Sequence, residues 1–395
     1  MGRTLTGLLL LLCATVCAAN TSPLVDFGDP NAANLWNEFR QLAKGKRTEP
    51  LRIMQFGDSH TAGDYFTGRL RILMQNRFGD AGIGWLPPGA ITNQRSAYFK
   101  AQNRGLWQLL DSKQPSQEGV FPLGGFYQIT PKGGRMEFNA KDPLAAGRWQ
   151  ISAWTQASGT GVWRLTLASG EQQALRANAD AKNPWNLSTL ETRAPNLEHF
   201  ALLAPRGSAI GGLALDRLTP GVTLDAIGTN GARGSQISRW DPHAMRRQML
   251  WRNPQLIILA YGTNEAFDFK FSSAEFESEL RDTVRQLRYY APNAALLLLS
   301  APTSAKPTPP NASAGCPQPL AMGLLGVLDV QKRIAREERT LYWDWTAFMG
   351  GPCGATRWAN RTPPLMGKDL IHLSRDGYEA SAEELFRALL ANIHG

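Results

Sequence analysis

Hydrophobic residues follow two different patterns along the chain. Near the start and again from residue 216 onward, short apolar runs alternate with segments whose apolar residues recur every three to four positions. The short runs predict buried strands, at 52–56, 222–227, 256–261, 294–300 and 341–345. The periodic segments predict helices, at 35–42, 65–76, from 272 to at least 287, 320–337 and 376–393. Strands that alternate with helices indicate an α/β fold with a parallel sheet covered on both faces.

The middle of the chain has a different pattern, short and alternating. Trp149, Ile151 and Ala153 are separated by residues that would face the opposite way, and Gly-containing turns follow at 158–161 and 169–170. This pattern is typical of an all-β sandwich or jelly roll. We therefore predict an α/β domain formed by residues 20–108 and 216–395, interrupted by an inserted β-sandwich module at 109–215.

Polar blocks follow several of the predicted strands and carry candidate catalytic residues. The blocks read GDSH at 57–60, GTNGA at 228–232 and GTNE at 262–265, and a fourth block, DLIH, stands at 369–372. A serine at a strand-to-helix turn can present its hydroxyl at the carboxyl edge of a sheet. It needs a neighbouring base to become nucleophilic, and an Asp three residues before a His can orient that base. Alone, the first or last block is equally consistent with a turn or a helix start; together the four blocks favour a serine hydrolase.

With these four blocks in order, the chain resembles the SGNH (GDSL-like) hydrolase family, whose domain is a three-layer α/β fold. The resemblance implies that Ser59 is the nucleophile, His372 the general base and Asp369 its orienting partner. It also implies an oxyanion hole formed by the backbone N–H groups of Ser59 and Gly231 and the side-chain amide of Asn264. Gly234 is the alternative to Gly231 if the second block is aligned a few residues later.

The chain departs from the family pattern at two positions. His60 stands where the pattern has Leu, and Glu265 stands where the third block usually has Asp. The longer text GDSHTAGDYF at 57–66, with the long interruption after it, resembles the bacterial peptidoglycan O-acetylesterases. His60 competes with His372 for the role of base, but a residue adjacent to the nucleophile reaches its hydroxyl poorly, so His372 is favoured.

The same resemblance implies that the β module is a jelly roll similar to carbohydrate-binding modules. Five tryptophans lie in or beside it: Trp107, Trp149, Trp154, Trp163 and Trp185. Their rings could stack on sugars, but tryptophans in strands more often belong to the core.

The first nineteen residues indicate the compartment. Residues 1–19 hold one charge, Arg3, then an apolar run and the small residues 17–19, which is typical of a secretory signal peptide and too short to span a membrane. We expect a monomeric periplasmic protein without an integral membrane span. Two cysteines then remain, Cys316 and Cys353, and in an oxidising compartment we expect them to form a disulfide, the alternative being two buried thiols.

Charge and missing motifs narrow the function further. There are 42 Lys and Arg against 33 Asp and Glu, a formal charge of +9. The basic residues are dispersed, which argues against a nucleic-acid partner and favours weak attraction to anionic wall polymers. No phosphate-binding loop, dinucleotide fingerprint or HExxH motif occurs, so we expect no cofactor and no metal.

The expected function is removal of O-acetyl groups from peptidoglycan glycan chains, at the carbon-6 hydroxyl of N-acetylmuramic acid. That substrate is implied by the resemblance alone, whereas acyl transfer is indicated by the residues. Two alternatives remain open: an O-acetyltransferase with the same triad, and a non-catalytic wall-binding protein.

Overall fold

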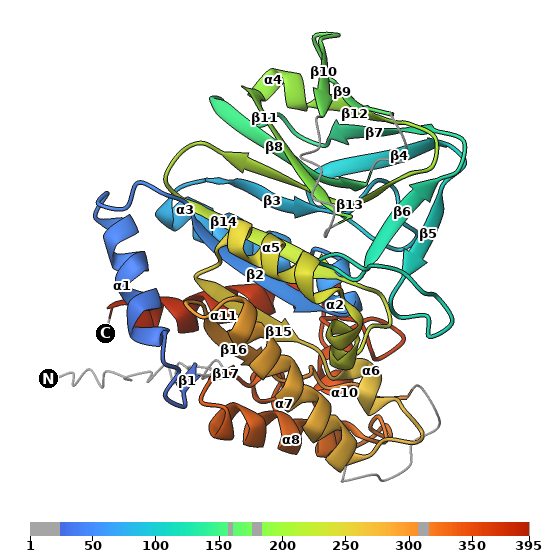
Figure 1. Ribbon diagram of the computed structural model, residues 1–395. Coiled ribbons are helices and arrows are strands. Elements are labelled where there is room, and N and C mark those ends of the chain that lie inside the picture. The colour runs from blue at the N-terminus through green and yellow to red at the C-terminus, as the bar shows by residue number, and fades with distance from the viewer. Residues whose placement is uncertain (1–23, 157–160, 176–183, 307–315, 395) are drawn as a thin grey trace, which may run out of the picture.

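The computed structural model describes residues 24–156, 161–175, 184–306 and 316–394, and it centres on a six-stranded sheet (Figure 1). In spatial order the strands are β1 (Val25–Asp26), β17 (Leu341–Trp343), β16 (Ala295–Leu299), β15 (Leu256–Ala260), β2 (Leu51–Gly57) and β14 (Val222–Gly228). All neighbours are parallel except β1, which runs antiparallel to β17. The predicted strands are present with bounds that shift by one or two residues. The predicted signal peptide, 1–19, lies outside the described residues.

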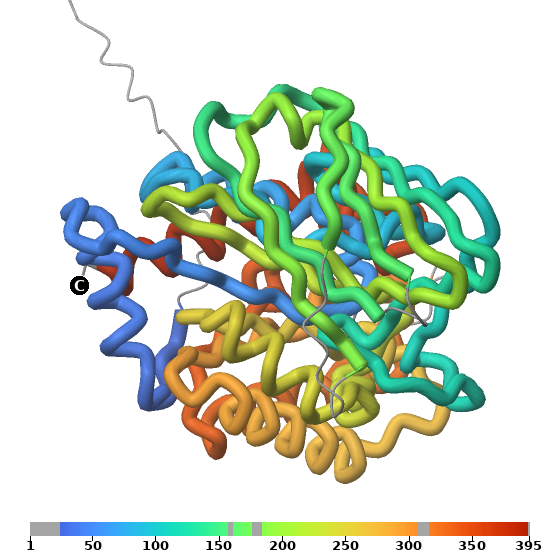
Figure 2. The backbone as a smooth tube through the Cα atoms, turned by 45° about the horizontal axis from the view of Figure 1, so that its top comes forward, coloured from blue at the N-terminus to red at the C-terminus, as the bar shows by residue number. Residues whose placement is uncertain are grey.

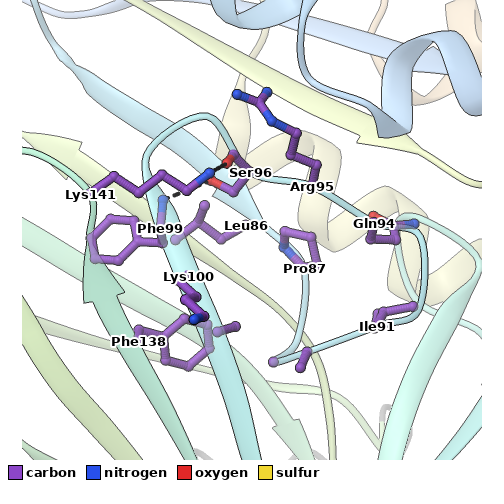
Figure 3. A pocket seen from close by; sticks show the side chains of 13 residues that line it. Leu86, Pro87, Ile91, Gln94, Arg95, Ser96, Phe99, Lys100, Phe138 and Lys141 are labelled. Atoms are coloured by element: carbon purple, nitrogen blue, oxygen red, sulfur yellow. Dashed lines mark hydrogen bonds between the residues drawn. The ribbon is translucent and has the colours of Figure 1, made fainter.

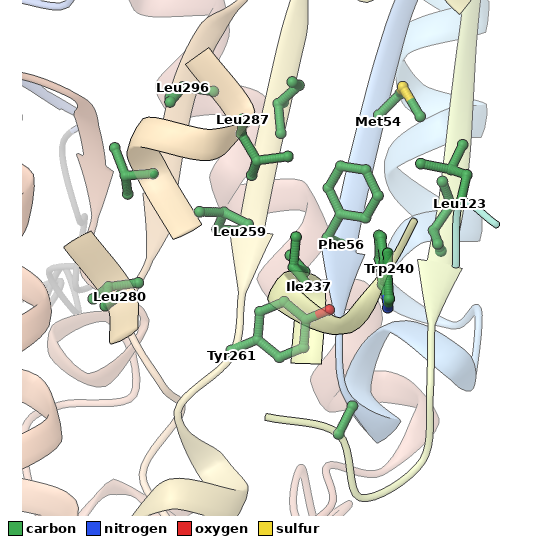
Figure 4. Close-up of a cluster of buried hydrophobic side chains, with 14 of the residues drawn as sticks. Met54, Phe56, Leu123, Ile237, Trp240, Leu259, Tyr261, Leu280, Leu287 and Leu296 are labelled. Atoms are coloured by element: carbon green, nitrogen blue, oxygen red, sulfur yellow. The ribbon is translucent and has the colours of Figure 1, made fainter. Parts of the chain in front are cut away.

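Alternating strand residues divide between two hydrophobic clusters. Ile258 and Leu297 belong to a cluster with helices α1 (Ala32–Ala43), α3 (Phe66–Phe78) and α11 (Arg375–His394). Ile257 and Leu296 belong to a cluster with helices α5 (Pro242–Arg252), α7 (Ser273–Tyr290) and α8 (Leu324–Glu337). Figure 4 shows the second cluster, with strand residues beside Leu280 and Leu287 of α7. Because successive strand side chains point to opposite faces, the two helix groups pack on opposite faces of the sheet.

Short helices mark the carboxyl ends of the parallel strands. Helix α2 (Ser59–Ala62) follows β2, the 3-10 helix η1 (Gly234–Arg239) follows β14, α6 (Thr263–Ala266) follows β15, and α9 (Trp345–Phe348) follows β17. Parallel strands end at the same edge of the sheet, so the first three polar blocks are gathered there. A further helix, α10 (Gly354–Ala359), begins next to Cys353.

Two antiparallel sheets form the β module. One sheet contains β10 (Gln172–Leu175), β9 (Trp163–Thr166), β12 (His199–Ala204), β7 (Gly134–Ala140) and β4 (Phe99–Gly105). The other contains β11 (Asn186–Arg193), β8 (Arg148–Gln156), β13 (Ser208–Arg217), β6 (Phe126–Thr130) and β5 (Gln108–Asp111), with β3 (Gly82–Leu86) paired to β13; α4 (Ala194–Leu197) connects the sheets. Trp149, Ile151 and Ala153 share one cluster with Phe138 and Leu202 of the opposite sheet, as their alternation predicts.

The antiparallel strands begin ahead of residue 109, where the sequence pattern placed the start of the module. Strand β3 pairs with β13, and β4 pairs with β7 along its length. Two of the five residues of β3 are glycines, which are uncommon in strands, and its partner lies more than a hundred residues away. Local pattern therefore could not assign β3 to the module.

The module and the α/β domain share one core. Trp85, Trp154 and Trp185 belong to the same cluster as Met245 and Met249 of α5. Figures 1 and 2 show the strands of the module together on one side of the molecule. Of the five tryptophans considered as sugar platforms, four are only 1–3% exposed, and Trp107 is partly buried. Those four serve the core rather than a sugar-binding surface.

A buried ion cluster lies at the junction of the two parts. Arg252 at the end of α5 donates to Asp216 of β13 at 2.5 Å and to Asp225 of β14 at 2.7 Å. All three side chains are almost fully buried. Removal of one partner from such a cluster leaves an uncompensated buried charge, so the cluster fixes the end of the module against the domain.

The predicted disulfide is confirmed. Cys316 and Cys353 are bonded, with Cα atoms 5.3 Å apart. The bond joins the segment before α8 to the start of α10, two segments that follow β16 and β17 in the chain. Among the helices of the described ranges, none has the length and apolar character that a membrane span requires.

Candidate active site

Ser59 lies at the turn between β2 and α2. Asp58 caps α2 by accepting the N–H of His60 at 3.0 Å, and Ser59 is the first residue of the helix. A Cβ on Gly57 would lie 2.1 Å from Thr61 Oγ1 and 2.8 Å from the carbonyl oxygen of Ala260. Only glycine fits there, so the sequence Gly-Asp-Ser makes the tight turn that places the hydroxyl at the sheet edge.

The structure brings the fourth block to this hydroxyl. Ser59 Oγ lies 2.9 Å from Nε2 of His372, and His372 Nδ1 lies 2.7 Å from Oδ2 of Asp369. Asp369 Oδ1 also accepts the N–H groups of Ile371 and His372, both at 3.0 Å. A carboxylate at Nδ1 favours the tautomer in which Nε2 can accept a proton from the serine.

Asp369 remains ionised in this arrangement. Partial burial acts to raise the pKa of Asp369, but hydrogen bonds from the His372 ring and from two backbone N–H groups outweigh it and hold the pKa below its usual value. The side chains of Asp369 and His372 are 49% and 45% exposed. The pair therefore lies at the rim, open to solvent and substrate.

His60 lies in a different environment, beneath the nucleophile. It is 2% exposed, its Nδ1 is 2.8 Å from the hydroxyl of Tyr378, and its ring centre is 5.5 Å from that of His372. Burial, followed by repulsion from His372, lowers the pKa of His60 to about 3. The Ser59 hydroxyl is bonded to His372, so His60 is a neutral packing residue.

Asp58 is buried beside His60 and is also perturbed. Burial raises the pKa of Asp58 to about 7, against the lowering effect of the His60 N–H, and the nearby Glu265 raises it further. Glu265 is itself buried, and burial raises its pKa. The floor of the site therefore contains carboxyls that hold protons more strongly than usual, whereas the rim carboxylate Asp369 does not.

Glu265, which departs from the family pattern in the third block, binds two backbone N–H groups. Its Oε1 accepts the N–H of Gly234 at 2.9 Å, and its Oε2 accepts the N–H of Gly262 at 3.1 Å. The carboxylate thus joins the end of β15 to the start of η1. Because the Gly234 N–H is bonded to Glu265, it is committed to this link.

The second and third blocks also contact each other through Asn264. The Asn264 side-chain amide donates to the carbonyl oxygen of Ala232 at 2.8 Å. An Asn amide has two N–H groups, so one remains available to a ligand. This bond holds Asn264 beside the block that contains Gly231.

Residues outside the four blocks support the second block, and no motif in the sequence indicates them. Lys113 belongs to the module, and its ammonium donates to the carbonyl oxygen of Asn230, in the second block, at 2.7 Å. Asn230 donates to the carbonyl oxygen of Asn93 at 2.9 Å, and Gln94 donates to that of Gly228 at 2.7 Å. The module and the loop after β3 therefore both stabilise the position of the block that contains Gly231. No group of three or more metal-ligating side chains occurs within the described ranges.

Comparisons with known proteins identify the family of the chain. Residues 81–196 match the family model described as peptidoglycan O-acetylesterase, N-terminal, and residues 206–380 match the GDSL-like lipase/acylhydrolase family. A solved structure described as a peptidoglycan O-acetylesterase in action is 32% identical, with 94% of this chain and 99% of that chain covered and a TM-score of 0.80. No curated protein matches the chain by sequence.

Two further solved structures are more distant. A putative GDSL-like lipase from Parabacteroides merdae is 16% identical over 43% of this chain and 73% of that chain, with a TM-score of 0.31. A family two carbohydrate esterase from Cellvibrio japonicus is 11% identical over 75% of this chain and 99% of that chain, with a TM-score of 0.29. Similarity at this level adds nothing to the argument.

The fold and the matched families define a GDSL-like acylhydrolase, which is a carboxylic ester hydrolase. An extra region rich in antiparallel sheets accompanies the hydrolase domain. The chain belongs to the peptidoglycan O-acetylesterase family.

Proposed function

We propose that this protein hydrolyses O-acetyl esters of peptidoglycan at the carbon-6 hydroxyl of N-acetylmuramic acid, with Ser59, His372 and Asp369 as its triad. One observation carries the proposal. The Ser59 hydroxyl, the His372 ring and the Asp369 carboxylate form a continuous chain of contacts of 2.9 and 2.7 Å at an exposed sheet edge. Family membership gives the substrate class.

The first half of the reaction forms an acetyl-enzyme. Ser59 Oγ attacks the acetyl carbonyl carbon while His372 Nε2 accepts its proton, and Asp369 stabilises the imidazolium. The tetrahedral intermediate then collapses, the bond to the sugar oxygen breaks, and His372 returns the proton to that oxygen. In the second half, water attacks the acetyl carbonyl with His372 again as base, and acetate leaves with Ser59 restored.

The oxyanion formed in each half needs donors aimed at it. We assign them to the N–H groups of Ser59 and Gly231 and to the second amide N–H of Asn264. The engagement of the Gly234 N–H by Glu265 supports Gly231 over Gly234. The bond from Asn264 to Ala232 supports the role of Asn264, because it orients the amide without using both of its N–H groups.

We propose that the antiparallel region is a jelly roll similar to carbohydrate-binding modules and that it spans about residues 81–217 rather than 109–215. The pairing of β3 with β13 and of β4 with β7 supports the earlier boundary. Its contact through Lys113 with Asn230 supports a role in bracing the site and placing the polymer. We further propose a monomer in the periplasm, exported by the signal peptide expected at 1–19.

The test is to incubate the purified protein with O-acetylated peptidoglycan and to follow acetate. We expect free acetate and loss of the carbon-6 ester signal in the nuclear magnetic resonance spectrum of the glycan. Transfer of acetate to an added muroglycan, with little free acetate, would instead identify a transferase. Turnover of aryl acetates with no release from peptidoglycan would retain the esterase chemistry and reject the substrate.

A further inference from the structure

A cavity of about 260 Å³ lies where the loop after β3 meets strands β4 and β7 (Figure 3). Its lining includes Leu86, Phe99 and Phe138, which give it an apolar floor. Phe138 is held by stacking on Phe200, with ring centres 4.8 Å apart. The cavity is open to solvent at one side, where Lys100 and Lys141 are exposed.

The charges around this cavity have one sign. Arg95, Lys100 and Lys141 line it, and none of its lining residues is acidic. Lys141 donates to the carbonyl oxygen of Ser96 at 2.7 Å, and Arg95 donates to the carbonyl oxygens of Gly63 and Asp64 at 3.2 and 3.1 Å. Carbonyl oxygens orient these groups without neutralising them. The Arg95 guanidinium is also 4.0 Å from the centre of the Tyr65 ring and points away from the cavity (Figure 3), so Lys100 and Lys141 are the cations that favour an anionic ligand there.

Asp64 and Asp142 attract Lys141 electrostatically, but neither forms an ion pair with it. Asp64 lies under the loop, but its oxygens accept the N–H of Ala97, the hydroxyl of Thr67 and the guanidinium of Arg71. Asp142 follows Lys141 in the chain and lines a different cavity. Within the described ranges, no carboxylate forms an ion pair with Arg95, Lys100 or Lys141.

The loop that forms the cavity is bonded to the catalytic segments. The Arg95 N–H donates to the carbonyl oxygen of Ala62 at 3.1 Å, at the end of the helix that begins with Ser59. Asn93 and Gln94 contact the second block through Asn230 and Gly228, as described above. The loop that lines this cavity is therefore bonded directly to two of the segments that form the site.

We propose that this cavity binds the carboxylates of the stem peptide on the muramic acid residue that carries the acetyl ester. The inference rests on the proposed function. Stem peptides combine alanine methyl groups with free carboxylates, which matches an apolar floor beside the two lysines Lys100 and Lys141. The lactyl group that carries the peptide and the carbon-6 ester belong to one sugar ring, so a site for the peptide near Ser59 would orient the ester for attack.

The test compares O-acetylated muropeptides whose stem carboxyls are free with the same muropeptides amidated at those carboxyls, and uses an aryl acetate as reference. The variant is Lys100→Glu with Lys141→Glu, and the matched control is Lys132→Glu, an exposed lysine of the same module outside the cavity. For the free-carboxyl muropeptide, we expect the ratio of its kcat/KM to that of the aryl acetate to fall about tenfold in the double variant. The control should keep the wild-type ratio, and the drop should shrink at about 0.5 M salt because salt screens exposed charges. Thermal unfolding checks that each variant is folded.

The amidated muropeptide gives the decisive comparison. Its ratio should be equal in the wild type and the double variant. An equal drop on both muropeptides, or no drop on either, overturns the inference and leaves the proposed hydrolysis intact.

A binding experiment tests this inference independently of the proposed function. Titration of the Ser59→Ala protein with the stem tripeptide, with free or amidated carboxyls, requires no hydrolysis. We expect binding of the free form only, weakened by Lys100→Glu with Lys141→Glu. Equal binding of both forms, or of neither, contradicts the cavity assignment. Lack of acetate release by the wild type would instead reject the proposed function.

Discussion

The active site has two histidines whose ring centres are 5.5 Å apart, one buried beneath Ser59 and one on the rim, and they are suited to opposite tasks. His60 is enclosed by Tyr378 and Trp345, and burial keeps it neutral. His372 is nearly half exposed and holds an ionised Asp369 at one nitrogen and the Ser59 hydroxyl at the other. A general base must take up and release a proton in each cycle, so exposure together with a carboxylate partner is the property that matters. Adjacency to the nucleophile in the sequence does not make a histidine suited to this role.

Ser59→Ala should produce the largest effect. We expect acetate release to fall by about a thousandfold or more with the folded structure retained, because the members of a triad act as a unit. Ser238→Ala, at an exposed serine of η1, is the matched control and should keep wild-type rates. A Ser59→Ala protein that retains about a tenth of the activity would remove Ser59 from the mechanism.

His372→Ala and His60→Gln test the two regions directly. We expect His372→Ala to lower kcat/KM on an aryl acetate by about a thousandfold, and His60→Gln by less than about tenfold. Gln was chosen because it can still bond the Tyr378 hydroxyl but cannot titrate. The reverse order of losses would make His60 the base.

Asp369→Asn should have a smaller effect, because it leaves the base in place but disturbs its tautomer. The expected loss is about a hundredfold to a thousandfold in kcat, with KM little changed. Steady-state kinetics on the aryl acetate separates the two constants. A change confined to KM would indicate that Asp369 binds substrate and does not orient His372.

The smallest predicted effect concerns stability and pH at His60. The pKa of His60 is about 3 in the folded state, below the unfolded value of about 6.5. Between these two pH values, His60 is therefore protonated in the unfolded state and neutral in the native state. Stability contributed by neutral His60 is complete above pH 6.5 and declines as pH falls. From pH 6.5 to about 4.5, the wild type should lose about 2–3 kcal/mol of unfolding free energy relative to His60→Gln.

Urea unfolding at several pH values measures this difference. Asp58 acts in the opposite direction, because its pKa of about 7 lies above its unfolded value and its protonation stabilises the fold at low pH. Both proteins contain Asp58, so its contribution cancels in the comparison. A stability difference that stays constant across this pH range would show that His60 is not held neutral.

The sequence predicted the central strands and the longer helices of the α/β domain except α5, because their signals are local. Buried parallel strands appear as continuous apolar runs, and helix α7 begins at a serine, Ser272, whose hydroxyl accepts the N–H of Glu275 at 3.3 Å. The start of the module could not be predicted, because β3 is short, rich in glycine and defined by a distant partner.

The same distinction applies to the site. Ser59, His372 and Asp369 stand in short sequence blocks whose residue types and spacing indicate their chemistry. The burial of His60 depends on Tyr378 and Trp345, which lie some three hundred residues away, and the link from Lys113 to Asn230 joins two parts of the fold. Such contacts exist only after folding, and no local pattern encodes them.

An acetyl group attached to Ser59 is the intermediate that the proposed mechanism requires. Turnover of an aryl acetate should be quenched in acid within the first cycles, and the digested protein mapped by mass spectrometry. We predict acetyl on the peptide that contains Ser59 in the wild type and none in Ser59→Ala. Acetyl found on another residue during turnover, or an unlabelled wild type together with an active Ser59→Ala protein, would contradict the proposed mechanism.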